Sequence, residues 1–454
     1  MTHARPVSRG GDEKASVIMQ NNDDSKDGEK PLTAPLSRRS FVAAGSAGLA
    51  TVALRGIASA QTPAPASDPP PAEKAAETVI PQYRPPVSDP GPINATLLKM
   101  NPSANNPPPT DHGDTGPIWY SFNLSHRREQ PGGWTHQVTE RSLPTSTDIA
   151  GVDMRLNTGA YRELHWHTAA EWSFMLYGNA RISVLNPDGT VFLKDVSRGD
   201  LWYFPAGYPH SIQGLEPDGC EFLLIFDQGE FSEEDTFLLS DWVRHTPPDV
   251  LAKNMNLSPA SVAKFPNHDL YIFPGKVPPS LATDKESVGG PAALSPTSFS
   301  FNMMGMKPAF SGPGGSAIVV DSRSFPVSKT VASALVTVHP GAMRELHWHP
   351  NASEWQFYIS GQARMTVFIT PSQARTMDYH EGDVGFVPLM AGHYIENTGN
   401  TDLVYLEIFR APEFIDFSLN NWLRHLPPEM VSAHLNISAD AIRRIPSRKN
   451  AVLI

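Results

Sequence analysis

Short runs in which polar and apolar residues alternate recur along the chain from about residue 115 onward. Residues 181–184 (RISV) and 364–368 (RMTVF) alternate with a period of two, which is typical of strands that bury one face. Turn signals separate such runs, among them residues 186–189 (NPDG) and the pair Gly199-Asp200. Long helical periods are rare here, so the pattern predicts a sandwich or small barrel of short strands.

Helical patterns are brief and occur in two matching places. Residues 248–254 and 258–264 are expected to be helical, and so are residues 428–435 and 438–443. Ser258 and Ser438 are of the residue type that favours helix N-caps. We therefore expect short helices that flank the strands of each half.

The second half of the chain repeats the first. Residues 159–167 read GAYRELHWH and recur as GAMRELHWH at 341–349, an offset of 182. Further matches join residues 131–133 to 313–315, 199–200 to 382–383, and 241–248 to 421–428. Because the match spans most of each half, it predicts a tandem duplication, with an N-terminal domain at 111–275 and a C-terminal domain at 276–454.

The first 110 residues follow a different pattern. The pair Arg38-Arg39 precedes a 14-residue apolar run that begins at Phe41, and residues 58–60 (ASA) resemble a cleavage site. This layout predicts a signal peptide of the twin-arginine type at 1–60. The run is shorter than the roughly 20 residues that span a bilayer, so we expect export to the periplasm or medium without a membrane anchor. Residues 61–110 are proline-rich and predict a linker, or an arm that packs on a neighbouring subunit.

Composition narrows the possible functions. Hydrophobic residues make up 40% and charged residues 18%, as in a globular protein. A single cysteine, Cys220, excludes an internal disulfide framework and a four-thiolate zinc site. The net charge of −11 argues against binding to nucleic acid or to an anionic membrane. A small anionic substrate would therefore need a local cation.

Each half carries the same four candidate metal ligands. On a strand, His165 and His167 would place both imidazoles on one face, with Glu171 following a turn and His210 coming later. The second copy supplies His347, His349, Glu354 and His393. Three neutral imidazoles and one carboxylate suit Mn²⁺ or Fe²⁺, with two octahedral positions left for water or substrate. Zinc would accept these ligand types but prefers a tetrahedral site.

The spacing of these residues resembles the two motifs of the cupins. Gly-x5-His-x-His-x3-Glu-x6-Gly runs from Gly159 to Gly178, and a version with x4 before the glutamate runs from Gly341 to Gly361. The second motif comprises Gly199, Pro205, Gly207 and His210, and then Gly382, Pro388, His393 and Asn397. From about residue 115 to 450 the chain resembles the bicupins, specifically the oxalate decarboxylases. The resemblance implies an all-β fold of two cupin barrels, each a double-stranded β-helix or jelly roll with short flanking helices.

Two positions depart from the family pattern. Gly214 stands where asparagine is usual, and Met390 replaces the glycine of Pro-x-Gly. Neither residue is a candidate ligand, so the departures concern the shape of the loops.

The resemblance also implies a reaction. Oxalate decarboxylases are manganese enzymes that split oxalate into formate and CO₂ and require O₂. We therefore expect two Mn²⁺ ions per chain, O₂ as co-catalyst, oxalate as the small-molecule substrate, and a homo-trimer or homo-hexamer. Arg162 and Arg344, each three residues before the first histidine of its motif, are expected to pair with a substrate carboxylate. Strand alternation counted from His165 alone would place Arg162 on the opposite face.

The carbon that remains after loss of CO₂ needs a proton, so a carboxylic acid must lie near the site. The first copy has three residues more between Phe226 and Trp242 than the second has between Phe409 and Trp422. Residues 232–235 (SEED) match the four-residue lid of the decarboxylases, and Glu233 matches its catalytic glutamate. The family commonly has asparagine and serine at the last two lid positions, where this chain has Glu234 and Asp235; the sequence does not determine how this difference changes lid motion.

The second copy has no such lid. Its candidate is Glu407, which matches the second-site glutamate of the family. The N-terminal site is therefore expected to be the main catalytic one.

Three other functions remain open from the sequence. A bicupin oxalate oxidase would yield CO₂ and H₂O₂ if no acid protonated the intermediate, and Glu233 argues against it. A non-catalytic metal-binding bicupin is the second alternative, and the retention of all eight candidate ligands argues against it. The third is a metal-dependent dioxygenase that acts on larger substrates.

Overall fold

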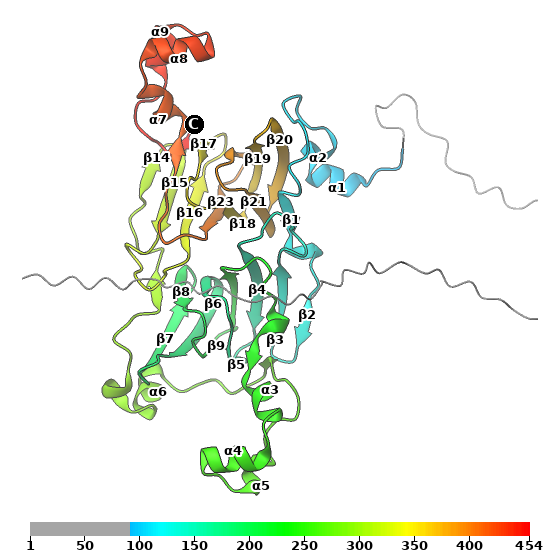
Figure 1. The fold of residues 1–454 in the computed structure, drawn as a ribbon, viewed down its shortest axis with the longest axis vertical. Coiled ribbons are helices and arrows are strands. Elements are labelled where there is room, and N and C mark those ends of the chain that lie inside the picture. Colours follow the sequence, from blue (N-terminus) through cyan, green and yellow to red (C-terminus); the bar gives the residue numbers. More distant parts are fainter. Residues whose placement is uncertain (1–90) are drawn as a thin grey trace, which may run out of the picture. The chain divides into compact units, whose positions relative to one another are not determined.

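The structure of the protein is a computed structural model that describes residues 91–454 (Figure 1). The predicted signal peptide and residues 61–90 of the predicted arm lie outside the described residues. None of the helices within 91–454 has the length and apolar character needed to cross a membrane.

The N-terminal half forms a barrel of antiparallel strands. The long strand β6 (Glu171–Leu185) links its two layers, because its first part pairs with β8 and β10 and its second part with β7 and β9. The strands are β2 (Arg128–Gln130), β3 (Gly133–Val138), β4 (Ala150–Leu156), β5 (Tyr161–Trp166), β7 (Val191–Ser197), β8 (Asp200–Phe204), β9 (His210–Gly214), β10 (Cys220–Phe226), β11 (Phe237–Leu238) and β12 (Ile272–Phe273).

The C-terminal half repeats this arrangement, with the corresponding strand divided into β18 (Glu354–Ser360) and β19 (Gln362–Ile369). The other strands are β14 (Phe310–Gly312), β15 (Gly315–Val320), β16 (Ala332–Val338), β17 (Met343–Trp348), β20 (Gln373–His380), β21 (Asp383–Val387), β22 (Gly392–Asn397), β23 (Leu403–Phe409), β24 (Phe417–Ser418) and β25 (Val452–Leu453). The prediction of two cupin barrels in tandem duplication is confirmed.

Each barrel is completed by a strand from the segment that leads into the other one. Strand β1 (Trp119–Ser121) pairs with β21 of the C-terminal barrel, and β13 (Ser300–Asn302) pairs with β8 of the N-terminal barrel. Large apolar side chains from both halves, including Trp172 and Trp355, belong to one buried cluster. The two cupins therefore share part of their hydrophobic core.

The described part of the predicted arm packs on the C-terminal cupin of the same chain. It forms two short helices, α1 (Ala95–Met100) and α2 (Pro102–Asn105). The backbone N–H of Ser103 donates to Asp378 Oδ2 on β20 at 2.7 Å, and the Asn101 side chain donates to the Asp378 carbonyl at 3.0 Å. These residues are thus anchored by buried polar contacts.

Three short helices follow each barrel, and the sequence predicts the second and third of each set but not the first. In the first copy they are α3 (Leu239–Arg244), α4 (Pro248–Met255) and α5 (Pro259–Val262); in the second, α7 (Leu419–Arg424), α8 (Pro428–Leu435) and α9 (Ala439–Arg444). The hydroxyls of Ser258 and Ser438 accept hydrogen bonds from backbone N–H groups in the first turns of α5 and α9, as N-caps do. The remaining helix, α6 (Leu281–Ser287), lies in the connection between the cupins.

The two departures from the cupin pattern have different structural outcomes. Met390 keeps the loop shape of its counterpart Gly207: both have a left-handed backbone, with φ of 64° and 78°, and both N–H groups donate to the carbonyl of a motif histidine. Gly214 has no room for a side chain, because a Cβ atom would lie 2.4 Å from the Asn157 carbonyl oxygen. Its counterpart Asn397 instead donates to the carbonyls of Val338, at the end of β16, and Thr401.

We expect Met390→Gly to raise the free energy of unfolding by about 1 kcal/mol. The left-handed conformation costs a non-glycine residue roughly this amount, and the Met390 side chain is 63% exposed, so little packing is lost. The matched control is Gly207→Ala, whose added Cβ would meet no atom within 4 Å and which should destabilise the protein by a similar amount. Thermal unfolding measures both changes, and a less stable Met390→Gly protein would contradict the explanation.

Candidate metal centres

The structure brings together all eight candidate ligands in two separate clusters. In each cluster one ligand atom from every residue lies within 4.8 Å of those of the others, and all eight side chains are buried. The barrel strands supply these positions: the first histidine lies on β5 or β17, the glutamate begins β6 or β18, and the last histidine lies on β9 or β22. Each cupin thus holds a four-residue His/Glu metal-binding site.

Hydrogen bonds to the backbone fix the tautomer of each histidine in the N-terminal cluster. A carbonyl oxygen can only accept, so each Nδ1 atom carries the proton and donates it. The acceptors are the carbonyls of Glu163 for His165 (2.6 Å), Ala169 for His167 (2.6 Å) and Tyr208 for His210 (2.7 Å). In a neutral ring Nε2 then carries the lone pair, which is the form that ligates a metal.

The Nε2 atoms of two of these histidines face a carboxylate. Nε2 of His167 and Nε2 of His210 lie 3.2 and 3.3 Å from Glu171 Oε2. Burial lowers the pKa of His165 and of His210, which opposes a second proton on either ring. Although burial opposes it, the contacts with His210 and His167 lower the pKa of Glu171. Lone pairs and an anion at this spacing fit a divalent cation between them.

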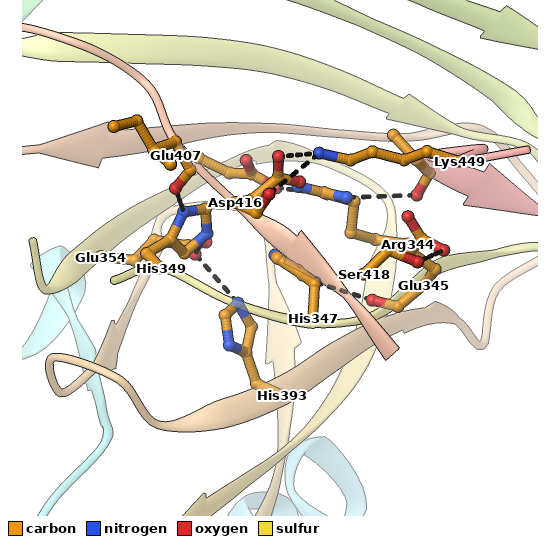
Figure 2. A network of polar contacts seen from close by, with 12 residues as sticks. Arg344, Glu345, His347, His349, Glu354, His393, Glu407, Asp416, Ser418 and Lys449 are labelled. Carbon is orange, nitrogen blue, oxygen red and sulfur yellow. Dashed lines mark hydrogen bonds and ion pairs between the residues drawn. The ribbon is translucent and has the colours of Figure 1, made fainter. Parts of the chain in front are cut away.

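The C-terminal cluster has the same arrangement (Figure 2). The Nδ1 atoms donate to the carbonyls of Glu345 for His347 (2.7 Å), Ile415 for His349 (2.8 Å) and Ala391 for His393 (3.1 Å). Nε2 of His349 and Nε2 of His393 each lie 2.9 Å from Glu354 Oε2. Burial lowers the pKa of His347. Within residues 91–454, the buried Nε2 atom of His347 has no hydrogen-bond partner, so this donor set also fits a metal ion.

A β-bulge turns Arg162 towards the N-terminal cluster. The pairing of β5 with β9 shifts register between Arg162 and His165, and β17 has the same irregularity between Arg344 and His347. Simple alternation therefore fails at this point, because a bulge adds one residue and reverses the face. Arg162 is buried and lines one cavity together with His165 and Glu171.

The lid segment places Glu233 at the same cavity. Residues Glu233–Asp235 form a 3₁₀ turn, in which the first side chain is buried and Glu234 and Asp235 are exposed. The Tyr271 hydroxyl donates to Glu233 Oε2, while Oε1 has no partner among the described residues. Burial raises the pKa of Glu233, and Arg162 and Tyr271 oppose this rise. The carboxyl group is thus biased towards the neutral, proton-donating form.

The two arginines have different surroundings. The Arg162 guanidinium donates from Nη1 to the Tyr271 carbonyl at 3.4 Å and lies 4.2 Å from the centre of the Tyr271 ring. No carboxylate of residues 91–454 lies within ion-pair distance of it. Arg344, in contrast, forms two buried ion pairs, with Glu407 at 3.1 Å and Asp416 at 3.0 Å (Figure 2).

Three residues at the two centres were not predicted from the sequence: Tyr271, Asp416 and Lys449. Tyr271 and Lys449 lie about a hundred residues beyond the arginines and approach them only because β12 and β25 pair with β5 and β17. Asp416 belongs to the short loop that the sequence shows in place of the lid in the second copy, but the sequence does not indicate that Asp416 pairs with Arg344. No local motif connects these positions to the ligands.

We expect His165→Ala and His347→Ala each to lower the metal content from two ions per chain to one, because each removes one of four ligands from a separate buried cluster. His245→Ala, which changes a histidine whose side chain is 64% exposed, is the control and should retain both ions. Elemental analysis after dialysis measures the content. An unchanged metal content in the protein with both substitutions would contradict the assignment.

Comparison with known proteins agrees with this architecture. The Cupin family model matches residues 121–263 and again residues 301–443. Over 362 residues the chain is 49% identical to oxalate decarboxylase OxdC of Bacillus subtilis (strain 168), covering 80% of this chain and 93% of the relative. It is 42% identical over 369 residues to a probable oxalate decarboxylase of Arthroderma benhamiae, covering 80% and 90%.

A solved structure gives the same result. A structure of Bacillus subtilis oxalate decarboxylase matches this chain with a TM-score of 0.77 and 48% identity, covering 80% of this chain and 95% of the Bacillus chain. That study describes Mn(II) centres in the Bacillus enzyme. The identity, the coverage and the duplicated cupin domain together show that this chain belongs to the oxalate decarboxylase family of bicupins.

Proposed function

We propose that the protein is a manganese-dependent oxalate decarboxylase that cleaves the C–C bond of oxalate to give formate and CO₂, with O₂ as co-catalyst. The N-terminal centre is the main catalytic site. The kinship with the Bacillus subtilis enzyme and its Mn(II) centres supports the choice of substrate and metal. His₃Glu donor sets suit a divalent manganese ion and leave coordination positions for a substrate.

One observation carries the proposal. At the N-terminal centre a buried arginine without a carboxylate partner and a buried carboxyl group line the same cavity as the metal ligands. A bound Mn²⁺ would supply a Lewis acid that polarises and orients oxalate. Arg162 would bind a substrate carboxylate through charge-assisted hydrogen bonds. Glu233 would be the proton donor.

The proton balance explains why the acid is needed. Oxalate as a dianion loses CO₂ and leaves a carbon that carries the electron pair of the broken bond. Glu233 donates its proton to that carbon from Oε1, the oxygen not held by Tyr271, and a C–H bond forms. The products are formate and CO₂, and Glu233 regains a proton from water. The overall reaction involves no net oxidation, so O₂ is not consumed.

The alternatives find less support. An oxalate oxidase would need a site without a proton donor, whereas Glu233 is buried beside the ligands. A non-catalytic bicupin would not need the eight ligands with oriented tautomers. The cavity between these side chains has a volume of about 10 Å³, far below the roughly 300–1,000 Å³ of pockets that hold drug-sized ligands. This size argues against a dioxygenase for large substrates.

The N-terminal sequence and the family resemblance support two further proposals. We propose export through the twin-arginine-type signal at 1–60, which sequencing of the mature N-terminus would test. We also propose a homo-trimer or homo-hexamer, which light scattering of the purified protein would test.

The deciding experiment is product analysis. Manganese-loaded protein is incubated with oxalate under air, and formate, CO₂ and H₂O₂ are quantified. Decarboxylation gives one formate for each CO₂ and little peroxide. Two CO₂ and one H₂O₂ for each oxalate, without formate, would overturn the proposal in favour of the oxidase.

We expect Glu233→Gln to lower the rate of formate production by about 10²–10⁴-fold, the usual contribution of a general acid. Glutamine retains the shape of the side chain but has no acidic proton, so part of the turnover should divert to peroxide. Glu234→Gln, which changes the exposed neighbour on the same lid, is the matched control and should behave as wild type. Equal formate rates in both variants would contradict the role of Glu233.

The rate of formate production should fall as pH rises through the pKa of Glu233. Only the protonated acid can donate, and its burial raises the pKa above the value of about 4.3 for an exposed glutamate. The rate should therefore persist into a pH range where an exposed carboxyl group has ionised. This falling limb of kcat should disappear from the residual activity of Glu233→Gln, and a limb that stays unchanged would assign it to another group.

A further inference from the structure

The duplication allows the two centres to be compared position by position. Strand pairing fixes which residues correspond, because β10, β11 and β12 of the first copy take the places of β23, β24 and β25. At three positions near the arginines the copies differ in charge. The pairs are Leu224 and Glu407, Thr236 and Asp416, and Asp269 and Lys449.

The C-terminal arginine has all its donor nitrogens occupied by the protein. Arg344 donates from Nε to Glu407 Oε1 at 3.1 Å, from Nη2 to Asp416 Oδ2 at 3.0 Å, and from Nη1 to the Ala451 carbonyl at 3.5 Å. The arginine and both carboxylates are at most 3% exposed. Each nitrogen of the guanidinium therefore already donates to the protein, and a ligand carboxylate would have to approach the two remaining N–H groups against the negative charge of Glu407 and Asp416.

Neighbouring groups hold these two carboxylates in place. The Tyr405 hydroxyl donates to Glu407 Oε1 at 3.0 Å. Lys449 forms an ion pair with Asp416 and also donates to its carbonyl oxygen at 3.2 Å (Figure 2). Two buried carboxylates thus face one buried cation, Arg344, and one partly exposed cation, Lys449. Breaking a buried pair is costly because it leaves an uncompensated charge.

The N-terminal centre lacks this set. Leu224 and Thr236 occupy the two carboxylate positions, and within residues 91–454 the guanidinium of Arg162 has only the Tyr271 carbonyl as a hydrogen-bond acceptor. The buried Thr236 hydroxyl lines the cavity and has no partner in the described part of the chain. The polar groups that an anionic ligand could satisfy are therefore present at this centre.

We propose that Glu407 and Asp416 occupy Arg344 in place of a substrate carboxylate, so that the C-terminal centre holds its metal ion but does not bind the dicarboxylate. This inference rests on the proposed function and adds to it the two residues that restrict the substrate to one centre. Arg344 and Glu407 then stabilise the second barrel and are not catalytic residues.

The test replaces these two carboxylates by the residues of the first copy, in the double variant Glu407→Leu/Asp416→Thr. Manganese-loaded protein without O₂ is titrated with oxalate in a calorimeter, so that binding is measured without turnover. Wild type should bind one oxalate per chain, and the variant should bind two while it retains both metal ions. Two equivalents in wild type, or one in a variant that retains both ions, would overturn the inference.

If the Glu407→Leu/Asp416→Thr variant loses its second metal ion, the converse double variant, Leu224→Glu/Thr236→Asp, tests the inference instead. It should retain two metal ions and bind no oxalate, because the new carboxylates would occupy Arg162. One equivalent bound by this variant would overturn the inference. If wild type itself binds no oxalate, both the proposed function and this inference fail. If wild type and both variants each bind one equivalent of oxalate, this inference is overturned and the proposed function stands.

Discussion

Both metal centres depend on the hydrogen bonds from histidine Nδ1 atoms to backbone carbonyls. Six such bonds, three in each cupin, leave six Nε2 atoms available to a metal ion. Five of the acceptors lie on the strands and turns next to the ligands, and the sixth, Ile415, lies in the loop between β23 and β24 that takes the place of the lid. The barrel therefore fixes most of the ligand geometry as it forms. Burial keeps the rings neutral, and each cluster carries a single carboxylate. This preorganisation is what outer-shell contacts contribute in metalloproteins.

The N-terminal centre contains buried polar atoms that have no protein partner. Glu233 Oε1 and Thr236 Oγ1 are both among them. An unsatisfied buried group costs roughly 1–3 kcal/mol, which is unfavourable in a purely structural site. Such local costs are expected where a ligand supplies the missing partners. The lid residue Glu233 also depends on Tyr271, which fixes one of its oxygens and leaves the other directed at the cavity.

The duplication explains how one scaffold supports two different environments. Backbone features recur in both copies, including the bulge before the first histidine and the left-handed residue at Gly207 and Met390. The differences lie in side chains around the arginines, where the second copy pairs Arg344 with Glu407 and Asp416. Because the barrels also exchange β1 and β13 and share a hydrophobic cluster, each centre is supported by packing that both halves provide.

The sequence alone was sufficient for two β-rich halves, for four of the six helices that follow the barrels and for the eight ligands, because these depend on local patterns: strand alternation, N-cap serines and a spacing repeated twice. The cupin form of the barrels came from the resemblance of that spacing to a known family. The position of Arg162 was not determined by such a pattern, since a bulge reversed the face that alternation assigns. The structure also decided the partners of Glu233 and Arg344. Tyr271 contacts Glu233, and Lys449 contacts Asp416, the partner of Arg344, across tens of residues of sequence. Only the pairing of β12 and β25 with the ligand strands brings these residues close. Contacts of this range depend on the whole sheet, which no local stretch of sequence encodes.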